Sequence, residues 1–340
     1  MKLVNENILI FGGTGSLGKA LIKRLSKKNR LAIYSRDEAK HWTIKNQLAN
    51  DSNVEFYVGD IRDASRVSEI CKLVNPTIII IASALKQVDT CEKSPFESIQ
   101  TNTLGIRNVC ESVTKLENFL SNLHTVLLVS TDKACAPTNV YGMSKALAER
   151  LVTSYQNYAP KVKFVAVRYG NVLESRGSIV PLFKHLIEVE SPLTVTDERM
   201  TRFIMTLDQS IDLIEKTINS AKSGQIWIPR IPAMRIIDLA TIFARRSNSK
   251  IRITGLRPGE KLHEDLVSEP ESIRTNNHDG HYVIESPFST SAPNDALFNY
   301  SSNQDLLELD NLENYLDSLG IFRMDIRDFH GREIEEIRGR

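Results

Sequence analysis

The first half of the chain alternates short apolar segments with longer segments in which apolar residues recur at helical spacing. The apolar segments predict strands at Asn7–Phe11, Leu31–Tyr34, Val54–Val58, Thr77–Ala82, Thr125–Ser130 and Lys163–Arg168. The amphipathic segments predict helices at Leu17–Lys28, His41–Ala49, Ala64–Val74, Ser94–Val113 and Val140–Asn157. Strands that alternate with helices form parallel sheets through right-handed crossovers, and continuous apolar runs suit strands buried on both faces. The pattern therefore predicts an α/β fold with a Rossmann-type, doubly wound parallel sheet.

This alternation ends after Arg168. A further helix is predicted at Ile204–Ala221, a further strand at Gln225–Ile228 and a late helix at Asp305–Leu319, while the intervening segments are richer in Pro, Gly, Arg and Thr. We expect a smaller lobe that is interleaved with the first domain. The predicted Rossmann domain consists of residues 1–169, and 204–229 return to it. The predicted lobe consists of 170–203 and 230–275. The remainder, 276–340, is predicted to be a partly irregular extension with a charged, solvated end, REIEEIRGR.

Composition narrows the possible partners. The 340 residues carry a formal net charge of +1, which gives no electrostatic reason to expect nucleic acid or a membrane surface as partner. No apolar run approaches the roughly 18 residues that span a bilayer. The four cysteines form no CxxC pair and no zinc-ligand spacing. We therefore expect a reduced, cytoplasmic protein without a metal site.

Three glycines follow the first predicted strand at the spacing GxxGxxG. Gly12 permits a tight turn, Gly15 lets the backbone approach a pyrophosphate, and Gly18 lets the next helix pack closely on the strand. The start of that helix attracts phosphate. The turn predicts a dinucleotide site, to which we also assign the neighbouring residues Thr14, Ser16 and Leu17.

The second predicted strand ends with residues that favour NADP over NAD. NAD-selective enzymes usually place an acidic residue here for the ribose 2′-hydroxyl, whereas Ser35 and Arg36 can hold a 2′-phosphate. Asp37 leaves NAD open, although it can instead cap the helix that follows. Asp60 is placed to accept from an adenine amino group. The other residues assigned to the cofactor site are Lys40, Ile61, Ala82, Ala84 and Lys86.

Residues 130–149, STDKACAPTNVYGMSKALAE, contain the candidate catalytic groups. Tyr141 and Lys145 are four positions apart and therefore share a helix face. The lysine charge can lower the pKa of the Tyr141 phenol. The resulting phenolate can take a proton from a sugar hydroxyl. Thr131 can hydrogen-bond the same hydroxyl. Asp132 and Lys133 follow at the carboxyl end of a parallel strand, where active sites of open α/β sheets form. An extra acid and an extra amine predict a second proton-transfer step, with Lys133 as base and Asp132 as acid, although the two could instead form a surface ion pair.

At these residues the chain resembles the inverting UDP-N-acetylglucosamine 4,6-dehydratases, a polysaccharide-biosynthesis family of the extended short-chain dehydrogenase/reductase superfamily. The resemblance runs from Asn7 to about Glu271. It is carried by FGGTGSLGK, YSRDEAK, GDIRD, ALKQV, TNTLGIRNV, STDKACAPTNVYGMSK, VRYGNVLESRGSIVP, MTRF and GLRPGEKLHE. Related dehydratases that act on dTDP- or GDP-hexoses typically carry an acidic pair where this chain has Asp132 and Lys133, and the lysine resembles the inverting group.

The resemblance implies a tightly bound, recycled NADP and UDP-N-acetylglucosamine as substrate. The implied reaction begins with oxidation at carbon 4, followed by loss of water from carbons 5 and 6. The hydride then returns to carbon 6, and carbon 5 is reprotonated from the opposite face. The product would be UDP-2-acetamido-2,6-dideoxy-β-L-arabino-hex-4-ulose. The residues it places around the UDP-sugar are Lys86, Asn171, Val180, Thr194, Arg202, Arg257 and Glu260.

Similar enzymes pair two adjacent helices between subunits, so we expect a homo-oligomer, a dimer or larger. The apolar candidates for that contact, which could also face the sheet, are Leu104, Val109, Val113, Leu147, Leu151 and Val152. Two other functions remain open. A UDP-hexose 4-epimerase would not need Asp132 and Lys133, and a non-catalytic dinucleotide-sensing protein would typically lack Tyr141.

Overall fold

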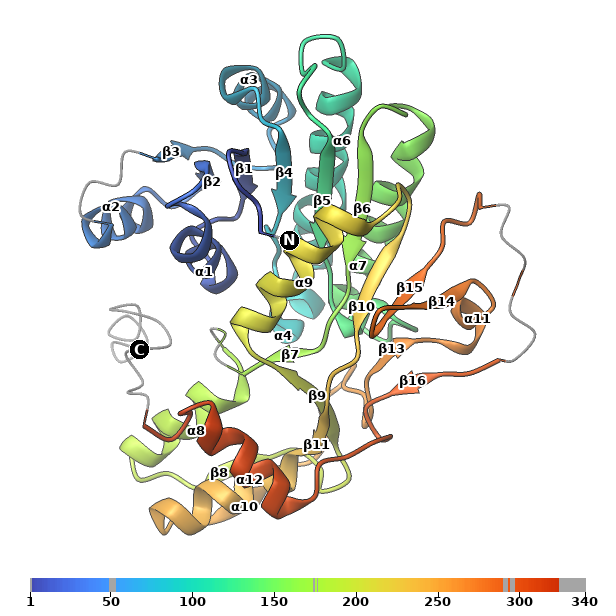
Figure 1. Cartoon of the computed structure of the whole chain (residues 1–340). Helices are drawn as coiled ribbons and strands as arrows, with labels where there is room; N and C mark the ends of the chain where they lie inside the picture. Colours follow the sequence, from blue (N-terminus) through green and yellow to red (C-terminus); the bar gives the residue numbers. More distant parts are fainter. Residues whose placement is uncertain are drawn as a thin grey trace. The chain divides into compact units, whose positions relative to one another are not determined.

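A computed structural model describes residues 2–48, 53–173, 175, 177–289, 293 and 297–323, and the chain forms two compact units (Figure 1). The first unit contains the residues up to Tyr169 together with Ile211–Arg230 and Leu266–Asn299. The second contains Gly170–Ser210, Ile231–Asp265 and the residues from Tyr300 onward. Both units are therefore discontinuous, and residues 266–299 belong to the first unit rather than to the predicted lobe or to a separate extension. The predicted charged end, REIEEIRGR, lies outside the described residues.

The first unit is built on a nine-stranded sheet in the order β14-β15-β10-β6-β5-β4-β1-β2-β3. Its strands are β1 Asn7–Phe11, β2 Arg30–Ser35, β3 Val54–Val58, β4 Ile78–Ile81, β5 Thr125–Val129, β6 Lys163–Val167, β10 Ile226–Pro229, β14 Thr275–His278 and β15 His281–Ile284. The pairs from β3 through β10 are parallel, and β15 pairs antiparallel with both of its neighbours, β10 and the edge strand β14. The strand order reverses between β1 and β4, which confirms the predicted Rossmann-type sheet.

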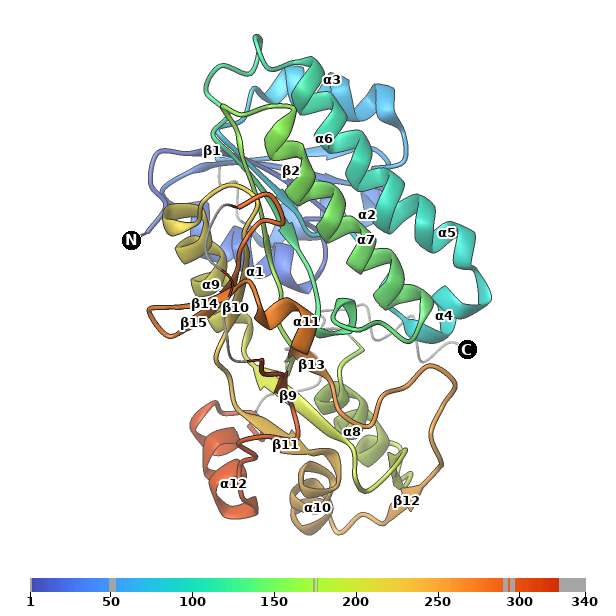
Figure 2. The ribbon, with the colours of Figure 1, turned by 90° about the vertical axis from the view of Figure 1, so that its right-hand side faces the viewer.

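Helices cover both faces of this sheet. Figure 2 shows α3, α6 and α7 side by side on one face of the sheet. Helix α1 and the part of α9 in this unit lie on the other face. There, Arg24 of α1 forms an ion pair with Asp212 of α9 at 2.9 Å. The helices of the unit are α1 Ser16–Leu25, α2 Glu38–Gln47, α3 Ala64–Val74, α4 Val88–Lys93, α5 Pro95–Ile99, α6 Gly105–Lys115, α7 Val140–Ser154 and α11 Glu269–Ser272, with 3-10 turns η2 Asp132–Ala134 and η3 Tyr155–Asn157. Helix α9, Leu207–Ser220, and strand β13, Asp265–Val267, run across the unit boundaries.

Two of the predicted helices have different bounds in the structure. Ser94–Val113 is not one α-helix, because a π-helical turn, η1 Gln100–Leu104, separates α5 from α6. The turn buries the polar side chains of Thr101, Asn102 and Thr103, which hydrophobic periodicity could not anticipate. The predicted helix Ile204–Ala221 begins later, because Ile204 and Met205 end strand β9.

The second unit has its own apolar core. Helices α8 Ile179–Glu188, α10 Ile236–Ser247 and α12 Leu309–Ser318 pack around buried residues that include Phe183, Leu239 and Leu316. One small sheet has the order β11-β9-β7 and another pairs β12 with β8. The strands of the unit are β7 Asn171–Val172, β8 Leu193–Val195, β9 Thr201–Met205, β11 Ala233–Arg235, β12 Ile251–Ile253 and β16 Tyr300–Ser301.

A buried ion network joins the end of the sheet of the first unit to two helices. The Arg168 guanidinium, 1% exposed, follows β6 and donates to Glu149 of α7 at 2.6 Å and to Glu271 of α11 at 2.8 Å. It also donates to the Leu266 carbonyl at 2.9 Å. Burial acts to raise the pKa of Glu271, but the charge and hydrogen bonds of Arg168 outweigh it and lower the pKa to about 2. The network therefore holds the segment that returns at Leu266 against α7.

We predict that Arg168→Met destabilises the protein by about 3–5 kcal/mol, because it leaves two carboxylates buried without a cation. Urea unfolding at pH 7 measures the loss. Below the ordinary glutamate pKa the difference from wild type should shrink as pH falls toward 2, since Glu271 contributes stability only while it is ionised.

The control is Arg107→Met, which removes a half-exposed i,i+4 pair with Glu111 on α6. Its cost should stay below about 1 kcal/mol. Equal losses in the two variants would show that burial of the Arg168 network does not set its strength.

Candidate active site

The glycine turn between β1 and α1 is shaped for a phosphate. A Cβ on Gly12 would meet the Ser83 backbone at 2.6 Å, and one on Gly18 would meet the Gly13 carbonyl oxygen at 2.2 Å, so both positions require glycine. A Cβ on Gly15 would meet only the Gly12 carbonyl oxygen, at 3.5 Å, which leaves open space over the turn. Helix α1 begins at Ser16, its N-cap residue Gly15 provides no side-chain cap, and its first turn contains no acid. The start of this helix therefore suits an anion.

The residues proposed to bind the 2′-substituent of the ribose lie together at the carboxyl end of β2. Ser35 ends the strand, and its hydroxyl lies 3.1 Å from the Thr14 hydroxyl of the glycine turn. Asp37 caps α2 by accepting from the Lys40 backbone N–H at 3.1 Å, and its carboxylate pairs with Lys40 Nζ at 3.1 Å. The structure thus gives Asp37 the helix-capping role. The Arg36 side chain remains more than half exposed, 3.8 Å from Asp60.

Asp60 and the segment after β4 complete this edge of the sheet. The Asp60 carboxylate accepts from Arg62 Nη2 at 2.7 Å and from the Arg62 backbone N–H at 2.9 Å, so it is already engaged beside the predicted adenine position. Ile61 is buried next to it. The Ala82 N–H donates to the Phe11 carbonyl at 2.9 Å, which extends the pairing of β4 with β1. Ala84 and Lys86 follow in the loop that leads to α4.

The candidate catalytic residues converge at the end of β5. Asp132 Oδ1 accepts from the Thr131 hydroxyl at 2.9 Å and from Lys133 Nζ at 3.1 Å. The Asp132 side chain is 1% exposed, and its Oδ2 accepts no hydrogen bond from the described residues. Ser130 Oγ is likewise buried without a partner there. Asp132 and Lys133 therefore form an ion pair in which the carboxylate is buried and the lysine is partly exposed, and one carboxylate oxygen receives no hydrogen bond from the described residues.

Helix α7 packs directly against this turn. Asn139 caps the helix by accepting from the Gly142 N–H at 2.8 Å. A Cβ on Gly142 would lie 2.2 Å from the Lys133 carbonyl oxygen, so only glycine allows the helix to approach this closely. One turn later, Lys145 is 2% exposed and donates to the Val129 carbonyl at 2.7 Å. Tyr141 and Lys145 are both buried on the face that meets β5.

Burial dominates the acid–base properties of this pair. It raises the pKa of Tyr141 to about 12, while the charge of Lys133 and the hydrogen bond with Thr131 act to lower it. Lys133, rather than Lys145 as the spacing predicted, contributes the largest lowering. Burial also lowers the pKa of Lys145 to about 8, although Glu149 acts to raise it. The phenol is therefore protonated at neutral pH, and a further positive charge beside it would be needed to make it a base.

The residues that the resemblance placed around the UDP-sugar, apart from Lys86, belong to the second unit. Arg202 is buried in β9, and its guanidinium donates to the backbone carbonyls of Lys261 at 3.0 Å and Leu262 at 3.1 Å. It thereby shapes the segment that carries Arg257 and Glu260, in which the Glu260 carboxylate accepts from the Arg257 backbone N–H at 3.2 Å. Arg257 itself is exposed.

Three further residues of the proposed sugar site belong to the same unit. Asn171 and Thr194 lie on β7 and β8. Val180 is fully buried in the apolar core, so its side chain offers no surface to a ligand in this unit.

Sequence reasoning missed a supporting residue, Asn102. The π-turn directs its amide to the segment after β4, where Oδ1 accepts from the Leu85 N–H at 2.8 Å and Nδ2 donates to the Leu85 carbonyl at 2.9 Å. The same amide donates to Ser144 Oγ on α7 at 3.0 Å, and Thr103 donates to the Ser144 carbonyl at 3.0 Å. In the sequence, the polar run QTNT inside an amphipathic segment was the feature that could have indicated this role of Asn102.

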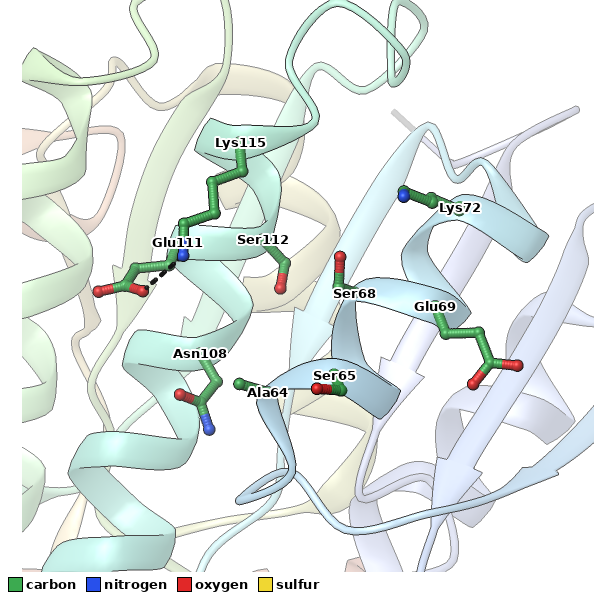
Figure 3. A pocket seen from close by; sticks show the side chains of 9 residues that line it. All are labelled: Ala64, Ser65, Ser68, Glu69, Lys72, Asn108, Glu111, Ser112 and Lys115. Carbon is green, nitrogen blue, oxygen red and sulfur yellow. Dashed lines mark hydrogen bonds and ion pairs between the residues drawn. The ribbon is translucent and has the colours of Figure 1, made fainter.

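A separate polar groove of about 440 Å³ lies between α3 and α6 (Figure 3). None of the predicted site residues lines it, and Glu111 and Lys115 pair across one helical turn on its wall at 3.3 Å. Within the described residues, no group of three or more His, Cys, Asp or Glu side chains is placed to hold a metal ion. No helix in the described part of the chain combines the length and apolar character that a membrane crossing requires.

The sheet order, the glycine turn, and Thr131, Tyr141 and Lys145 around the end of β5 together define an enzyme of the extended short-chain dehydrogenase/reductase class. Residues 8–286 match the family described as polysaccharide biosynthesis protein, and the chain belongs to that family. The predicted family and the prediction of an enzyme are both confirmed.

Two relatives of equal similarity have names that describe different reactions. UDP-N-acetylglucosamine 4,6-dehydratase (inverting) of Campylobacter jejuni is 39% identical over 285 residues, 82% of each chain. UDP-glucose 4-epimerase of Rickettsia bellii is 39% identical over 291 residues, 83% of each chain.

Solved structures show the same fold. The X-ray structure of Pen from Bacillus thuringiensis has a TM-score of 0.86 and 32% identity, covering 94% of this chain and 100% of its own. DesIV, a dTDP-glucose 4,6-dehydratase of Streptomyces venezuelae, has a TM-score of 0.65 at 18% identity, covering 75% of this chain and 86% of its own.

We predict that Gly142→Ala folds normally but loses activity about a hundredfold, because α7 or the 132–134 turn must move by about an ångström. A helical alanine is favourable by up to about 1 kcal/mol, which offsets only part of the clash with the Lys133 carbonyl, so the variant should also be destabilised by about 1–2 kcal/mol. Steady-state turnover and thermal unfolding measured together separate the two effects.

Ser154→Ala is the control at the far end of the same helix, where the hydroxyl binds only the Leu151 carbonyl. It should retain wild-type turnover. A Gly142→Ala protein with wild-type turnover would show that the close approach of α7 to Lys133 has no part in the chemistry.

Proposed function

We propose that this enzyme is a UDP-N-acetylglucosamine 4,6-dehydratase that inverts carbon 5. The observation that carries the proposal is the hydrogen-bonded Thr131–Asp132–Lys133 network beside Tyr141, with the Asp132 carboxylate buried at its centre. Oxidation at carbon 4 alone needs only the threonine, the tyrosine and Lys145. A buried acid and an amine at the same strand end provide for the loss of water that a dehydratase must also catalyse. The similarity to the inverting dehydratase of Campylobacter jejuni supports this reading.

The proposed cofactor is NADP, held by the glycine turn and the tip of β2. The open space over Gly15 and the uncapped start of α1 suit a pyrophosphate. Ser35, Arg36 and Lys40 supply a hydroxyl and two cations for a 2′-phosphate, and Asp37 is occupied by its helix cap. NADP, when bound, supplies the hydride acceptor and donor of the reaction.

In the first step, Tyr141 takes the proton from the carbon 4 hydroxyl. Its pKa of about 12 must fall for this, and Lys133 and Thr131 already act in that direction. A nicotinamide cation near the ring would lower the pKa further. Thr131 orients the hydroxyl, while Lys145 is held at the end of β5 by its hydrogen bond to the Val129 carbonyl.

In the second step, the carbon 4 ketone acidifies the proton on carbon 5, and Lys133 removes it after its ammonium proton has passed to the Asp132 carboxylate, to which it is hydrogen-bonded at 3.1 Å. Asp132 protonates the departing carbon 6 hydroxyl. Its Oδ2 is the atom suited to carry that proton, because Oδ1 already accepts two hydrogen bonds and Oδ2 accepts none from the described residues. Reprotonation of carbon 5 from the opposite face, together with the hydride that the bound cofactor would return to carbon 6, would then give the inverted 4-keto sugar.

A 4-epimerase is the second candidate, because relatives in Rickettsia have that name. Incubation of the purified protein with UDP-N-acetylglucosamine separates the two reactions. A product lighter by one water supports the dehydratase. A new hexose of unchanged mass would establish the epimerase, and no conversion would refute UDP-N-acetylglucosamine as the substrate.

We predict that Lys133→Ala oxidises carbon 4 but fails to eliminate water, so that reduced cofactor accumulates after substrate is added. Wild type should show little accumulation, because its hydride returns in each cycle. Deuterium at carbon 5 should be released to solvent by wild type and retained by the variant. Since Lys133 also lowers the pKa of Tyr141, oxidation in the variant should require a higher pH, and the measurement should cover pH 7 to about 10.

Tyr141→Phe serves as the contrasting variant, since it lacks the phenolic oxygen and should give neither reduced cofactor nor product. Release of deuterium by Lys133→Ala at the wild-type rate would remove Lys133 as the base and leave it as a partner of Asp132.

We also propose that the protein forms a homo-oligomer through α5, the π-turn and α7. Phe96, Ile99, Leu104, Met143 and Leu147 are exposed there, with Phe96 at 64% and Leu147 at 51%. Clustered exposed apolar side chains indicate a contact surface. Val109, Val113 and Val152, which were also candidates for this contact, are instead fully buried in the core of the first unit.

We predict that Leu147→Lys reduces the mass of the protein in sedimentation equilibrium at micromolar concentration, because a lysine charge would be buried in the contact. Leu73→Lys, at an exposed position of α3, should leave the mass unchanged. A wild-type monomer, or equal masses for all three proteins, would contradict this surface.

A further inference from the structure

His41 is a buried imidazole beside the proposed ribose site, and no role described so far uses it. It is 6% exposed on α2, and its Nε2 lies 2.7 Å from Ser35 Oγ. Ser35 Oγ in turn lies 3.1 Å from Thr14 Oγ1. Three side chains thus form one hydrogen-bonded chain from the glycine turn, through the tip of β2, to α2. The middle member is the hydroxyl assigned to the 2′-phosphate.

The surroundings of the imidazole favour its neutral form in the free protein. Burial lowers the pKa of His41, and this effect exceeds the opposing influence of Asp37 and Glu38 on its own segment. From β3 it faces the Phe56 ring, with the ring centroids 5.3 Å apart. From β2 it contacts the hydroxyl of Ser35, so the groups that β2 and β3 place against the ring carry no charge.

Whether His41 Nε2 carries a hydrogen decides what Ser35 offers a ligand, and a neutral ring carries one there only in its Nε2–H tautomer. An imidazolium can only donate from Nε2, so the Ser35 hydroxyl keeps its own hydrogen for a phosphate oxygen. A neutral ring protonated on Nδ1 instead takes the Ser35 hydrogen. Because Ser35 accepts from Thr14 on one lone pair, it then presents its other lone pair, which suits the hydroxyl hydrogen of an unphosphorylated ribose.

A phosphate bound to Ser35 would also act on His41 through its charge. It would lie one hydroxyl group away from Nε2, and an opposite charge within about 4–6 Å favours the charged form of a titratable group. NAD carries no such charge at its 2′-hydroxyl. The two cofactors therefore differ in the protonation state of His41 that they favour.

We propose that His41 makes the choice between NADP and NAD depend on pH, because binding of NADP takes up a proton at His41 and binding of NAD does not. This rests on the proposed cofactor site, and specifically on Ser35 contacting the 2′-phosphate. The sign follows from linkage: the affinity for NADP falls as pH rises through the neutral range, by up to about tenfold per unit, while the affinity for NAD stays level.

Titration calorimetry of the full chain with NADP⁺, in two buffers of different ionisation enthalpy, counts the protons taken up. At pH 7 we expect a substantial fraction of one proton for NADP⁺ and close to none for NAD⁺. The 2′-phosphate itself titrates near pH 6, so its contribution is measured in His41→Gln. That variant keeps an amide donor for Ser35 but cannot titrate, and it should bind NADP⁺ with only the residual uptake and a flatter pH profile.

His124→Gln is the matched control, since His124 is half exposed beside Thr125 on β5 and should leave the proton count unchanged. If His41→Gln folds poorly, Ser35→Ala tests the same chain, because it removes the hydroxyl between the imidazole and the ligand and should reduce both the affinity for NADP⁺ and the coupling. Proton uptake in His41→Gln equal to wild type, or equal uptake with NAD⁺ and NADP⁺, would overturn the proposal.

Arg36→Ala separates this inference from the cofactor assignment. A loss of NADP⁺ affinity well beyond that of NAD⁺ supports the assignment, and equal losses would refute it. The role of His41 is judged separately, from the ratio of the NADP⁺ affinity to the NAD⁺ affinity. A ratio that changes with pH in wild type and not in His41→Gln supports that role. A ratio that does not change with pH in wild type, or that changes equally in both proteins, refutes it.

Discussion

The close approach of α7 to the turn after β5 is the contact on which the rest of the catalytic unit depends. At Gly142 the helix backbone lies so near the Lys133 carbonyl that any side chain would displace one of them. This contact brings the first turn of the helix, with Tyr141, against the strand end that carries Thr131, Asp132 and Lys133. Because the five candidate groups come from only two elements, a single packing distance sets their mutual geometry.

Burial gives these groups their chemistry as well as their positions. A phenol with a pKa of about 12 and a lysine with one of about 8 lie within a single turn of α7, and both values are shifted mainly by desolvation. Asp132 adds a carboxylate oxygen that no described residue satisfies. Such groups are costly to bury, and the ion network of Arg168, Glu149 and Glu271 helps to hold α7 in place one turn beyond Lys145.

The names of the relatives show how narrow the functional difference is. Proteins named as dehydratase and as epimerase are each 39% identical to this chain over more than four-fifths of its length. Both reactions begin at carbon 4 and can share the glycine turn and Tyr141. The groups that separate them in our proposal are Asp132 and Lys133, so two adjacent residues at one strand end would decide whether a proton is also removed from carbon 5.

The sequence by itself determined the features that depend on local spacing. β1, β3 and α3 have the predicted bounds, because apolar periodicity within a few residues decides whether a segment suits a sheet or a helix face. The glycine triplet and the Tyr141–Lys145 spacing were readable for the same reason. Only the tertiary structure revealed the π-turn that directs Asn102 to Leu85, the chain from Thr14 through Ser35 to His41, and the Arg168 network. Most of these contacts join residues from different elements, up to 103 positions apart in the Arg168–Glu271 pair, and such pairs leave no periodic signal in one sequence. Whether a polar side chain is a surface group or a buried partner is decided by what the fold brings against it.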